Sequence, residues 1–274
     1  MDNALLRERA ALLRRLHDRT RILVLPNAWD VASARVVEKA GFPAIATSSA
    51  GVAAVLGYAD GERISRAEML EMVARIARAV RVPVTADLEA GYGGAAQTVE
   101  AALQAGAVGM NLEDAAAGGG LVPIAAQVEQ IKAARAAADR AGVPFVINAR
   151  TDVYLARIGE EQGRFAHAVE RARAWLAAGA DCAFVPGVRD ADTIGRLVRA
   201  IDGPINILAG PGTPDVPTLA ALGVARVSAG SATMRAALTA GLRAAEEMRD
   251  RGTYAFAENI LTHAEVNALL TPAK

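Results

Sequence analysis

Cysteine and histidine are scarce in this sequence of 274 residues. Cys182 is the single cysteine, so the chain cannot form an internal disulfide, and this usage is typical of a reducing compartment such as the cytoplasm. The three histidines, His17, His167 and His263, fall in segments that we expect to be helices or a C-terminal tail. A zinc site made of histidine and cysteine is therefore not expected.

The sequence also has no excess of charge of either sign and no long apolar run. The 30 Lys and Arg residues balance the 30 Asp and Glu residues, so no net field attracts nucleic acid or an anionic membrane. Charged residues or glycine interrupt the apolar stretches well short of the ~18 residues that a membrane span needs. Residues 1–20 have the pattern of an amphipathic helix and lack the apolar core of a signal peptide. We expect a soluble cytoplasmic protein that binds neither nucleic acid nor a membrane.

One pattern repeats along the chain: a short β-branched apolar run, a few loop residues, and an Ala- and Arg-rich segment of helical period. It indicates parallel strands joined by right-handed crossovers. The expected strands are Ile22–Leu25, Ala44–Thr47, Val84–Asp87, Gly109–Glu113, Phe145–Arg150, Cys182–Val185, Ile205–Leu208 and Ala225–Ser228. The expected helices are Val31–Ala40, Arg66–Ala79, Ala95–Ala105, Ile124–Ala141, Gly163–Ala178, Asp190–Ala200, Val216–Leu222 and Ala232–Arg251. Eight units, with no GxGxxG motif after the first strand, favour a (β/α)8 TIM barrel.

No linker or low-complexity stretch divides the chain, so we predict one domain over residues 1–274. It would have an N-terminal helix and a helical tail from about residue 252 to 274. Tyr254, Phe256, Ile260 and Leu261 make this tail too apolar to remain free in water. The tail packs either on its own barrel or on a neighbouring subunit, and the sequence leaves both open.

Acidic residues lie at the strand ends and in the following loops of three consecutive strand–helix units. Asp87 and Glu89 end the third strand two positions apart, so their side chains point the same way on an extended backbone. Glu113 ends the fourth strand, followed by Asp114 as a cap or supporting group, and Asp60 comes from the second unit. Converging carboxylates repel one another unless a hard cation neutralises them. Mg2+ suits such a site because it takes oxygen ligands and keeps several waters, with Mn2+ as an alternative.

Other candidates point to a small anionic ligand. Arg150 ends the fifth strand at the barrel mouth, where a guanidinium can clamp a carboxylate or phosphonate, or else pair internally with Asp152 or Glu113. The loop of Ser48, Ser49 and Ala50 is built of small residues that let backbone N–H groups approach an anion. Asn206 on the seventh strand is a weaker candidate for a ligand contact.

Four motifs in this order, TSSAGVAAVLGYAD, ADLEAGYGG, NLED and INARTD, resemble the isocitrate lyase/phosphoenolpyruvate mutase superfamily. The resemblance runs from about residue 25 to 232. It implies a Mg2+-dependent barrel enzyme that makes or breaks a C–C or P–C bond beside a 2-oxo acid through an enolate. It further implies a homo-oligomer, a dimer or a tetramer, with the eighth helix exchanged between subunits.

The resemblance also implies a role for each site residue. Asp87 resembles the direct metal ligand, and Asp60, Glu89 and Glu113 resemble the acids that hold the waters of the metal. Ser48, Ser49 and Ala50 match the loop that binds the pyruvyl-like oxygens, and Arg150 matches the substrate-clamping arginine.

Two departures from the family pattern affect the function. Glu89 stands where the family commonly has an aspartate. More importantly, residues 115–123, AAAGGGLVP, form a flap without the cysteine of the isocitrate lyases or the lysine and asparagine of the phosphonomutases. Cys182 cannot replace that cysteine, because it begins the sixth strand at the wrong end of the barrel. Tyr92 is a candidate proton donor, although it fits a packing role equally well.

Three functions follow from these features. The first is a lyase that cleaves a C–C bond next to a 2-oxo or 2-hydroxy carboxylate, with Arg150, Glu113 and Tyr92 as the catalytic candidates. The second is a P–C bond enzyme, a phosphonomutase or a phosphonopyruvate hydrolase, which the absence of cationic flap residues disfavours. The third is a 2-oxo acid binding protein with little catalysis, which only the bare flap supports.

Overall fold

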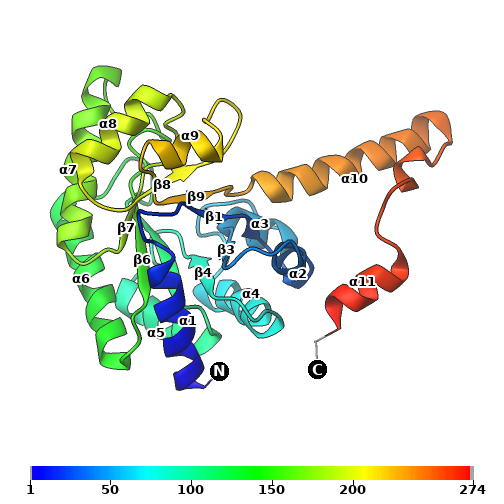
Figure 1. The fold of residues 1–274 in the computed structure, drawn as a ribbon, viewed down its shortest axis with the longest axis horizontal. Helices are drawn as coiled ribbons and strands as arrows, with labels where there is room; N and C mark the ends of the chain where they lie inside the picture. The colour runs from blue at the N-terminus through cyan, green and yellow to red at the C-terminus, as the bar shows by residue number, and fades with distance from the viewer. Residues whose placement is uncertain (1, 272–274) are drawn as a thin grey trace.

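A single parallel sheet closes into a barrel at the centre of the molecule (Figure 1). The structure is a computed structural model that describes residues 2–271. The strands are β1 (Leu23–Leu25), β2 (Asn27–Ala28), β3 (Ile45–Thr47), β4 (Val84–Asp87), β5 (Gly109–Glu113), β6 (Val146–Arg150), β7 (Cys182–Phe184), β8 (Ile205–Leu208) and β9 (Arg226–Ser228). They pair in the order β1-β9-β8-β7-β6-β5-β4-β3-β2, all parallel. The predicted TIM-barrel fold is confirmed.

The expected first strand, Ile22–Leu25, corresponds to β1, and β2 is an additional short strand that was not predicted. Pro26 separates the two because it has no N–H to donate to a ladder. β1 pairs with β9 and β2 pairs with β3, so the two short strands together close the sheet. Asn27 holds this junction: its Nδ2 donates to the carbonyl of Thr47 (2.7 Å), and its Oδ1 accepts the N–H groups of Ala229 and Gly230 (2.9 and 2.8 Å). The side chain of Asn27 therefore helps to close the barrel.

Helices surround the barrel (Figure 1). They are α1 (Asn3–Arg15), α2 (Val31–Lys39), α3 (Ser49–Val55), α4 (Arg66–Ala79), α5 (Ala95–Ala105), α6 (Ile124–Ala141), α7 (Glu161–Ala177), α8 (Ala191–Ile201), α9 (Val216–Ala221), α10 (Ala232–Arg251) and α11 (His263–Leu270), with a 3-10 turn at Ala255–Ala257. Four of the expected helices, α4, α5, α6 and α10, have the predicted bounds. The others differ by one or two residues at their ends, which reflects fraying and local capping.

One segment predicted as a loop is a helix. α3 begins directly after Ser48, whose Oγ caps the N–H of Gly51 (3.3 Å). Helical periodicity is hidden there, because the helix is short and buried on more than one side. Gly51 is required, since a Cβ atom at this position would lie 2.6 Å from Cβ of Trp29.

The last helices leave the barrel. α10 projects outward as a long arm, and the chain then turns back so that α11 lies near α2 (Figure 1). Leu269 of α11 is buried, and its carbonyl accepts from Nε of Arg35 on α2 (2.7 Å). α11 therefore lies against its own barrel, whereas Tyr254, Phe256, Ile260 and Leu261, on which the expectation of a packed tail rested, remain exposed. Packing of this part on a neighbouring subunit stays a prediction. Residues 272–274 of the expected tail lie outside the described residues.

The core fills the space between strands and helices. Its largest cluster packs α1, α5 and α6 against β4, β5 and β6, and a second cluster packs α8 against β7 and β8. The register of the strands decides which side chains lie next to one another at their carboxyl ends. Asp87 pairs with Asn111, and Glu113 pairs with Arg150, so the polar ends of β4, β5 and β6 stand side by side. No helix of the described chain is long and apolar enough to cross a membrane.

Candidate active site

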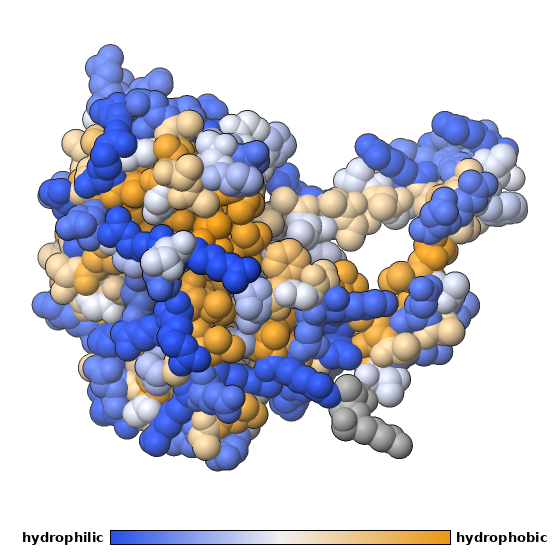
Figure 2. Space-filling view, viewed as in Figure 1, coloured by the Kyte–Doolittle hydropathy of each residue, from blue (hydrophilic) through white to orange (hydrophobic). Residues whose placement is uncertain are grey.

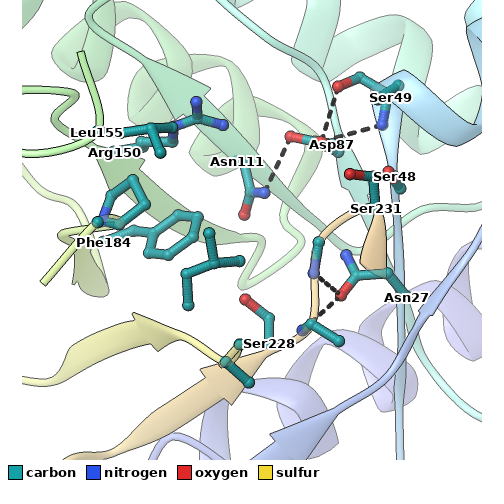
Figure 3. A pocket seen from close by; sticks show the side chains of 18 of the residues that line it. Asn27, Ser48, Ser49, Asp87, Asn111, Arg150, Leu155, Phe184, Ser228 and Ser231 are labelled. Atoms are coloured by element: carbon teal, nitrogen blue, oxygen red, sulfur yellow. Dashed lines mark hydrogen bonds between the residues drawn. The ribbon is translucent and has the colours of Figure 1, made fainter. Parts of the chain in front are cut away.

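A cavity of about 310 Å³ opens at the carboxyl ends of the strands (Figure 3). This is the edge where barrels of this kind carry catalytic groups. Its polar lining comes from several different strand ends. The lining includes Asn27, Ser48, Ser49, Ala50, Asp60, Asp87, Asn111, Arg150, Leu155, Phe184, Arg189, Thr213, Ser228, Ser231 and Arg235.

Asp87 lines this cavity between Ser49 and Asn111 (Figure 3). Its Oδ2 accepts from the backbone N–H and the hydroxyl of Ser49 (3.0 and 2.9 Å), and its Oδ1 accepts from Nδ2 of Asn111 (3.0 Å). The side chain is therefore fixed from both sides. Each carboxylate oxygen has about two acceptor positions, so Oδ1 retains one that these protein contacts leave open.

Asp60 and Glu89 approach Asp87 from neighbouring loops. Burial raises the pKa of Asp60, and the charge of Asp87 raises it further. Burial raises the pKa of Glu89 to about 7, against the hydrogen bonds that it accepts from the hydroxyl of Tyr92 (2.8 Å) and the N–H of Glu62. Asp60 lines the cavity, whereas Glu89 and Glu113 are not among the residues that line it. The acids repel one another through space, which shows that they face a shared region.

Glu113 and Arg150 form a buried ion pair. Arg150 also donates to both oxygens of Asp152, from Nε (2.6 Å) and from an Nη atom (2.9 Å), and its guanidinium lies 5.8 Å from the ring centre of Phe184. Burial raises the pKa of Glu113, and Arg150 opposes this effect. Burial disfavours the charge on Arg150, but Glu113 and Asp152 outweigh it and raise its pKa. Both internal pairings considered for Arg150 therefore exist, and Arg150 still lines the cavity.

The acidic side chains suit a divalent cation that keeps several of its waters. They do not suit a cation whose ligands all come from protein side chains. Within residues 2–271, no three His, Cys, Asp or Glu side chains come together closely enough to ligate one ion. Asp87 has an open acceptor position facing the cavity, and Asp60, Glu89 and Glu113 are coupled to it through space. Mg2+ keeps several of its waters and needs only one or two direct carboxylates. Asp87 would hold it directly, and the other acids would bind its waters.

The predicted substrate-binding residues separate into two groups. Ser48, Ser49 and Ala50 line the cavity at the start of α3, beside Asp87. Asn206 is fully buried on β8 and exchanges hydrogen bonds with the hydroxyl of Ser228 (3.2 Å), and it is absent from the cavity lining. Ser228, one strand further, reaches the cavity in its place.

Three other residues singled out in the sequence take supporting positions. The hydroxyl of Tyr92 points to Glu89, and burial raises the pKa of this tyrosine. Asp114 is fully buried, where it accepts from Arg171 (2.9 Å) and from the N–H of Asp152 (3.0 Å). Cys182 is buried at the start of β7, and burial raises the pKa of its thiol to about 12. A thiol in this position does not supply protons to the cavity.

The flap over residues 115–123 is a tight hairpin. Ala115 bridges to Leu121, and the N–H of Ala116 donates to the carbonyl of Gly120 (3.0 Å). Gly118, Gly119 and Gly120 all have positive φ angles between 80° and 100°, which explains the glycine run. None of these residues is part of the cavity lining.

Several cavity residues were not predicted from the sequence. Asn111 stands two positions before Glu113, so strand alternation could have identified it as pointing inward with that acid. Phe184, Arg189 and Arg235 carry no comparable signal. They reach the cavity from β7, from the loop that follows it and from the first turn of α10, and only barrel closure brings them together.

Comparisons with known proteins agree with this architecture. The phosphoenolpyruvate phosphomutase family model matches residues 13–249. A crystal structure of a Burkholderia cenocepacia protein, proposed there to be a lyase or mutase, is 40% identical, with a TM-score of 0.90 over 97% of this chain and 96% of that one. Oxaloacetate decarboxylase of Chromohalobacter salexigens is 33% identical over 82% of this chain and 79% of its own.

A structure of phosphonopyruvate hydrolase in complex with oxalate and Mg2+ has 29% identity and a TM-score of 0.83, over 95% of this chain and 94% of that one. Another neighbour, 2,3-dimethylmalate lyase, is described as a PEP mutase/isocitrate lyase superfamily member. These relatives are lyases, decarboxylases and hydrolases that share the barrel. The chain belongs to the phosphoenolpyruvate phosphomutase family, within the PEP mutase/isocitrate lyase superfamily.

Proposed function

We propose that this protein is a Mg2+-dependent lyase that breaks or makes a C–C bond next to a 2-oxo or 2-hydroxy carboxylate through an enolate. The observation that carries the proposal is Asp87, fixed by Ser49 and Asn111 with an open acceptor position toward the cavity. Asp60 and Glu89 support it, because burial and nearby acids raise their pKa values, and a cation held by Asp87 would favour their charged forms. Glu113 already has a cationic partner in Arg150 and would contribute through that pair.

In the cleavage direction, the bond to the leaving carbon breaks and its electron pair moves to the oxygen of the oxo group, giving an enolate. A proton then returns to the carbon next to the oxo carbon. When bound, Mg2+ would polarise the oxo group. The N–H of Ala50, in the first turn of α3, has no acceptor within its own helix and can bind a substrate oxygen.

Arg150 would clamp the carboxylate next to the oxo group. Glu113 and Asp152 use three of its five N–H donors, which leaves two for the substrate. Their charges also hold the guanidinium in one orientation, so Glu113 positions Arg150 as well as the waters of the cation. We assign Tyr92 to positioning Glu89, since its hydroxyl is bonded there.

The proposal is tested by Mg2+ titration calorimetry on the wild type and on Asp87→Asn, followed by product assays with pyruvate, 2-oxoglutarate and oxaloacetate. Asn keeps the shape of the side chain and removes its charge, so we expect Mg2+ affinity to fall by roughly 100-fold or more with the fold intact. Asp139→Ala, an exposed acid on α6, is the control.

Unchanged Mg2+ affinity in Asp87→Asn would remove the metal site. Binding of the oxo acids without turnover of any of them would favour an oxo-acid binding protein instead of an enzyme. Release of pyruvate from oxaloacetate would establish the lyase.

We also propose that the enzyme works as a homo-oligomer in the cytoplasm. Leu238 and Leu242 lie one turn apart on the projecting α10, and their side chains are 61% and 59% exposed. Two neighbouring exposed leucines form an apolar patch that a second subunit can cover. An apolar groove of about 560 Å³ lies between α2 and the start of α10, lined by Trp29, Val36 and Phe42 among others. The buried, unpaired Cys182 is compatible with a reducing compartment.

A further inference from the structure

The cavity has two walls of opposite charge. Asp60 and Asp87 form one wall. Arg189, in the loop between β7 and α8, and Arg235, in the first turn of α10 after β9, belong to the other. β8 lies between β7 and β9 in the sheet, so the two arginines flank its opening. Counting around the closed barrel, β8 stands opposite β4, whose end carries Asp87.

Neither arginine is neutralised. Within residues 2–271, the guanidinium groups of Arg189 and Arg235 make no hydrogen bond or ion pair. Two nearby acids are engaged as helix caps: Asp190 accepts the N–H of Thr193 (2.8 Å), and Asp215 accepts the N–H of Thr218 (3.0 Å). Arg150, in contrast, is held by two carboxylates. The wall opposite Asp87 therefore carries two free positive charges.

The position of Arg189 is supported by its packing. Its Cδ lies 3.7 Å from the place where a Cβ atom on Gly212 would stand, so its stem runs beside the loop that follows β8. Phe184 and Leu155 line the same cavity and lie near Arg150 (Figure 3).

We infer that Arg189 and Arg235 bind a second anionic group of the substrate, a carboxylate or a phosphonate, at the end remote from the oxo group. This inference rests on the proposed function, which places the oxo-acid end at Asp87 and Arg150. The planar fork of a guanidinium matches both anions. A cation held by Asp87 would favour the oxo-acid end, which offers two adjacent oxygens, and the arginines would favour the remote anion, so a dianionic oxo acid enters in one orientation.

This arrangement accounts for the bare flap. Residues 115–123 carry no charged side chain, and they do not line the cavity. The cations that recognise the remote end come from the opposite side of the barrel, from the units of β7 and β9. Specificity for the remote group is therefore set by two residues that are distant in the sequence from every acid of the metal site.

Calorimetry in the presence of Mg2+ tests the inference with three acids that share the oxo-acid end: oxaloacetate, 3-phosphonopyruvate and 2-oxobutanoate. The measured quantity is the ratio of dissociation constants between 2-oxobutanoate and each dianion. In the wild type we expect roughly tenfold tighter binding of at least one dianion. The preferred dianion identifies the remote group as a carboxylate or a phosphonate.

Arg189→Gln and Arg235→Gln should each reduce this ratio severalfold, and the double variant should bring it close to one. Arg243→Gln, an exposed arginine farther along α10 that does not line the cavity, should keep the wild-type ratio. An unchanged ratio in the double variant overturns the inference. Equal affinity of the wild type for all three acids overturns it too, and leaves the proposed function intact. Absence of binding for all three contradicts the proposed function, and the inference with it.

Discussion

Arg226 is the most deeply buried cation described in the barrel. It lies on β9 with no exposed surface, and burial lowers its pKa to about 10. No carboxylate pairs with it among the described residues: its Nη atoms lie 3.4 Å from Nε2 of His17 and 3.5 Å from Oδ1 of Asn111. The same Asn111 donates to Asp87, so the buried arginine helps to orient the amide beneath the candidate metal site.

His17 must remain neutral in this arrangement. Its Nδ1 lies 2.8 Å from the carbonyl of Leu13 and is assigned as the donor, which leaves Nε2 to accept from Arg226. Protonation would place an N–H on Nε2 against a buried cation. Burial, with Arg226 in addition, accordingly lowers the pKa of His17 from 6.5 to about 4.

His17 by itself should make the folded protein less stable as the pH falls from 6.5 to about 4. Buried acids with raised pKa values, such as Glu89, act in the opposite direction, so the contribution of His17 is the difference between the wild type and His17→Gln. In this window the unfolded chain protonates His17 and the folded chain does not, so protons favour unfolding. The loss is on the order of 3 kcal/mol. Urea unfolding at a series of pH values measures it, and in His17→Gln this part of the slope should disappear.

The control for this experiment is His263→Gln, which removes an exposed imidazole at the start of α11. Its stability should follow the pH dependence of the wild type. If His17→Gln retains the wild-type slope between pH 6.5 and 4, neutral His17 is not a source of acid sensitivity.

At the scale of elements, closure of the barrel depends on two very short strands, β1 and β2. β1 and β2 are three and two residues long, and Pro26 interrupts the ladder between them. Asn27 replaces the missing ladder with three hydrogen bonds to β3 and to the segment after β9. The hydroxyl of Thr233 on α10 also donates to the carbonyl of Asn27 (2.7 Å). Barrel closure and the start of the projecting helix therefore depend on one position.

Asn27→Ala should destabilise the fold by roughly 2–4 kcal/mol, because it leaves two N–H groups and one carbonyl without their partner. Thermal unfolding measures this as a lower Tm. Asn267→Ala, an exposed residue of α11, is the matched control and should have little effect. Equal changes in the two variants would show that the closure relies on backbone pairing alone.

At the scale of the whole molecule, a single copy of the chain leaves apolar side chains of α10 and of the segment after it exposed. α10 extends beyond the barrel, and Figure 2 shows hydrophobic residues along the part of α10 next to the barrel and in the segment that leads to α11, whereas the far end of the arm is largely hydrophilic. Met248, Tyr254 and Ile260 on this arm are all at least half exposed. An arm of this kind is stable when a second copy covers it.

Light scattering should therefore report a mass that is a multiple of 28.3 kDa. The double variant Leu238→Glu, Leu242→Glu places charges on the exposed face of α10 and should shift the mass toward that of one chain. Leu5→Glu, at another exposed leucine on α1, should leave it unchanged. A monomeric wild type at micromolar concentration would contradict the oligomer.

The barrel itself was predictable from the sequence, because strand and helix alternation is a local pattern. The buried runs, such as Val84–Asp87, are short and mostly apolar, and most helices end at a small-residue stop such as Gly106 or Gly142. Periodicity failed where burial was not one-sided, as in α3, and where a strand was only two residues long, as in β2 after Pro26. The single-domain interpretation and the roles of the site residues stay predictions.

The sequence by itself determined where the strands lie along the chain and which strand ends carry Asp87, Glu113 and Arg150. These features depend on residue type and on spacing along the chain. Only the tertiary structure decided that Arg150 is held by two carboxylates, that Asn111 and Ser49 fix Asp87, and that two free arginines face the acids. The physical reason is that these contacts join loops distant in sequence, and the closure and register of the barrel set their distances.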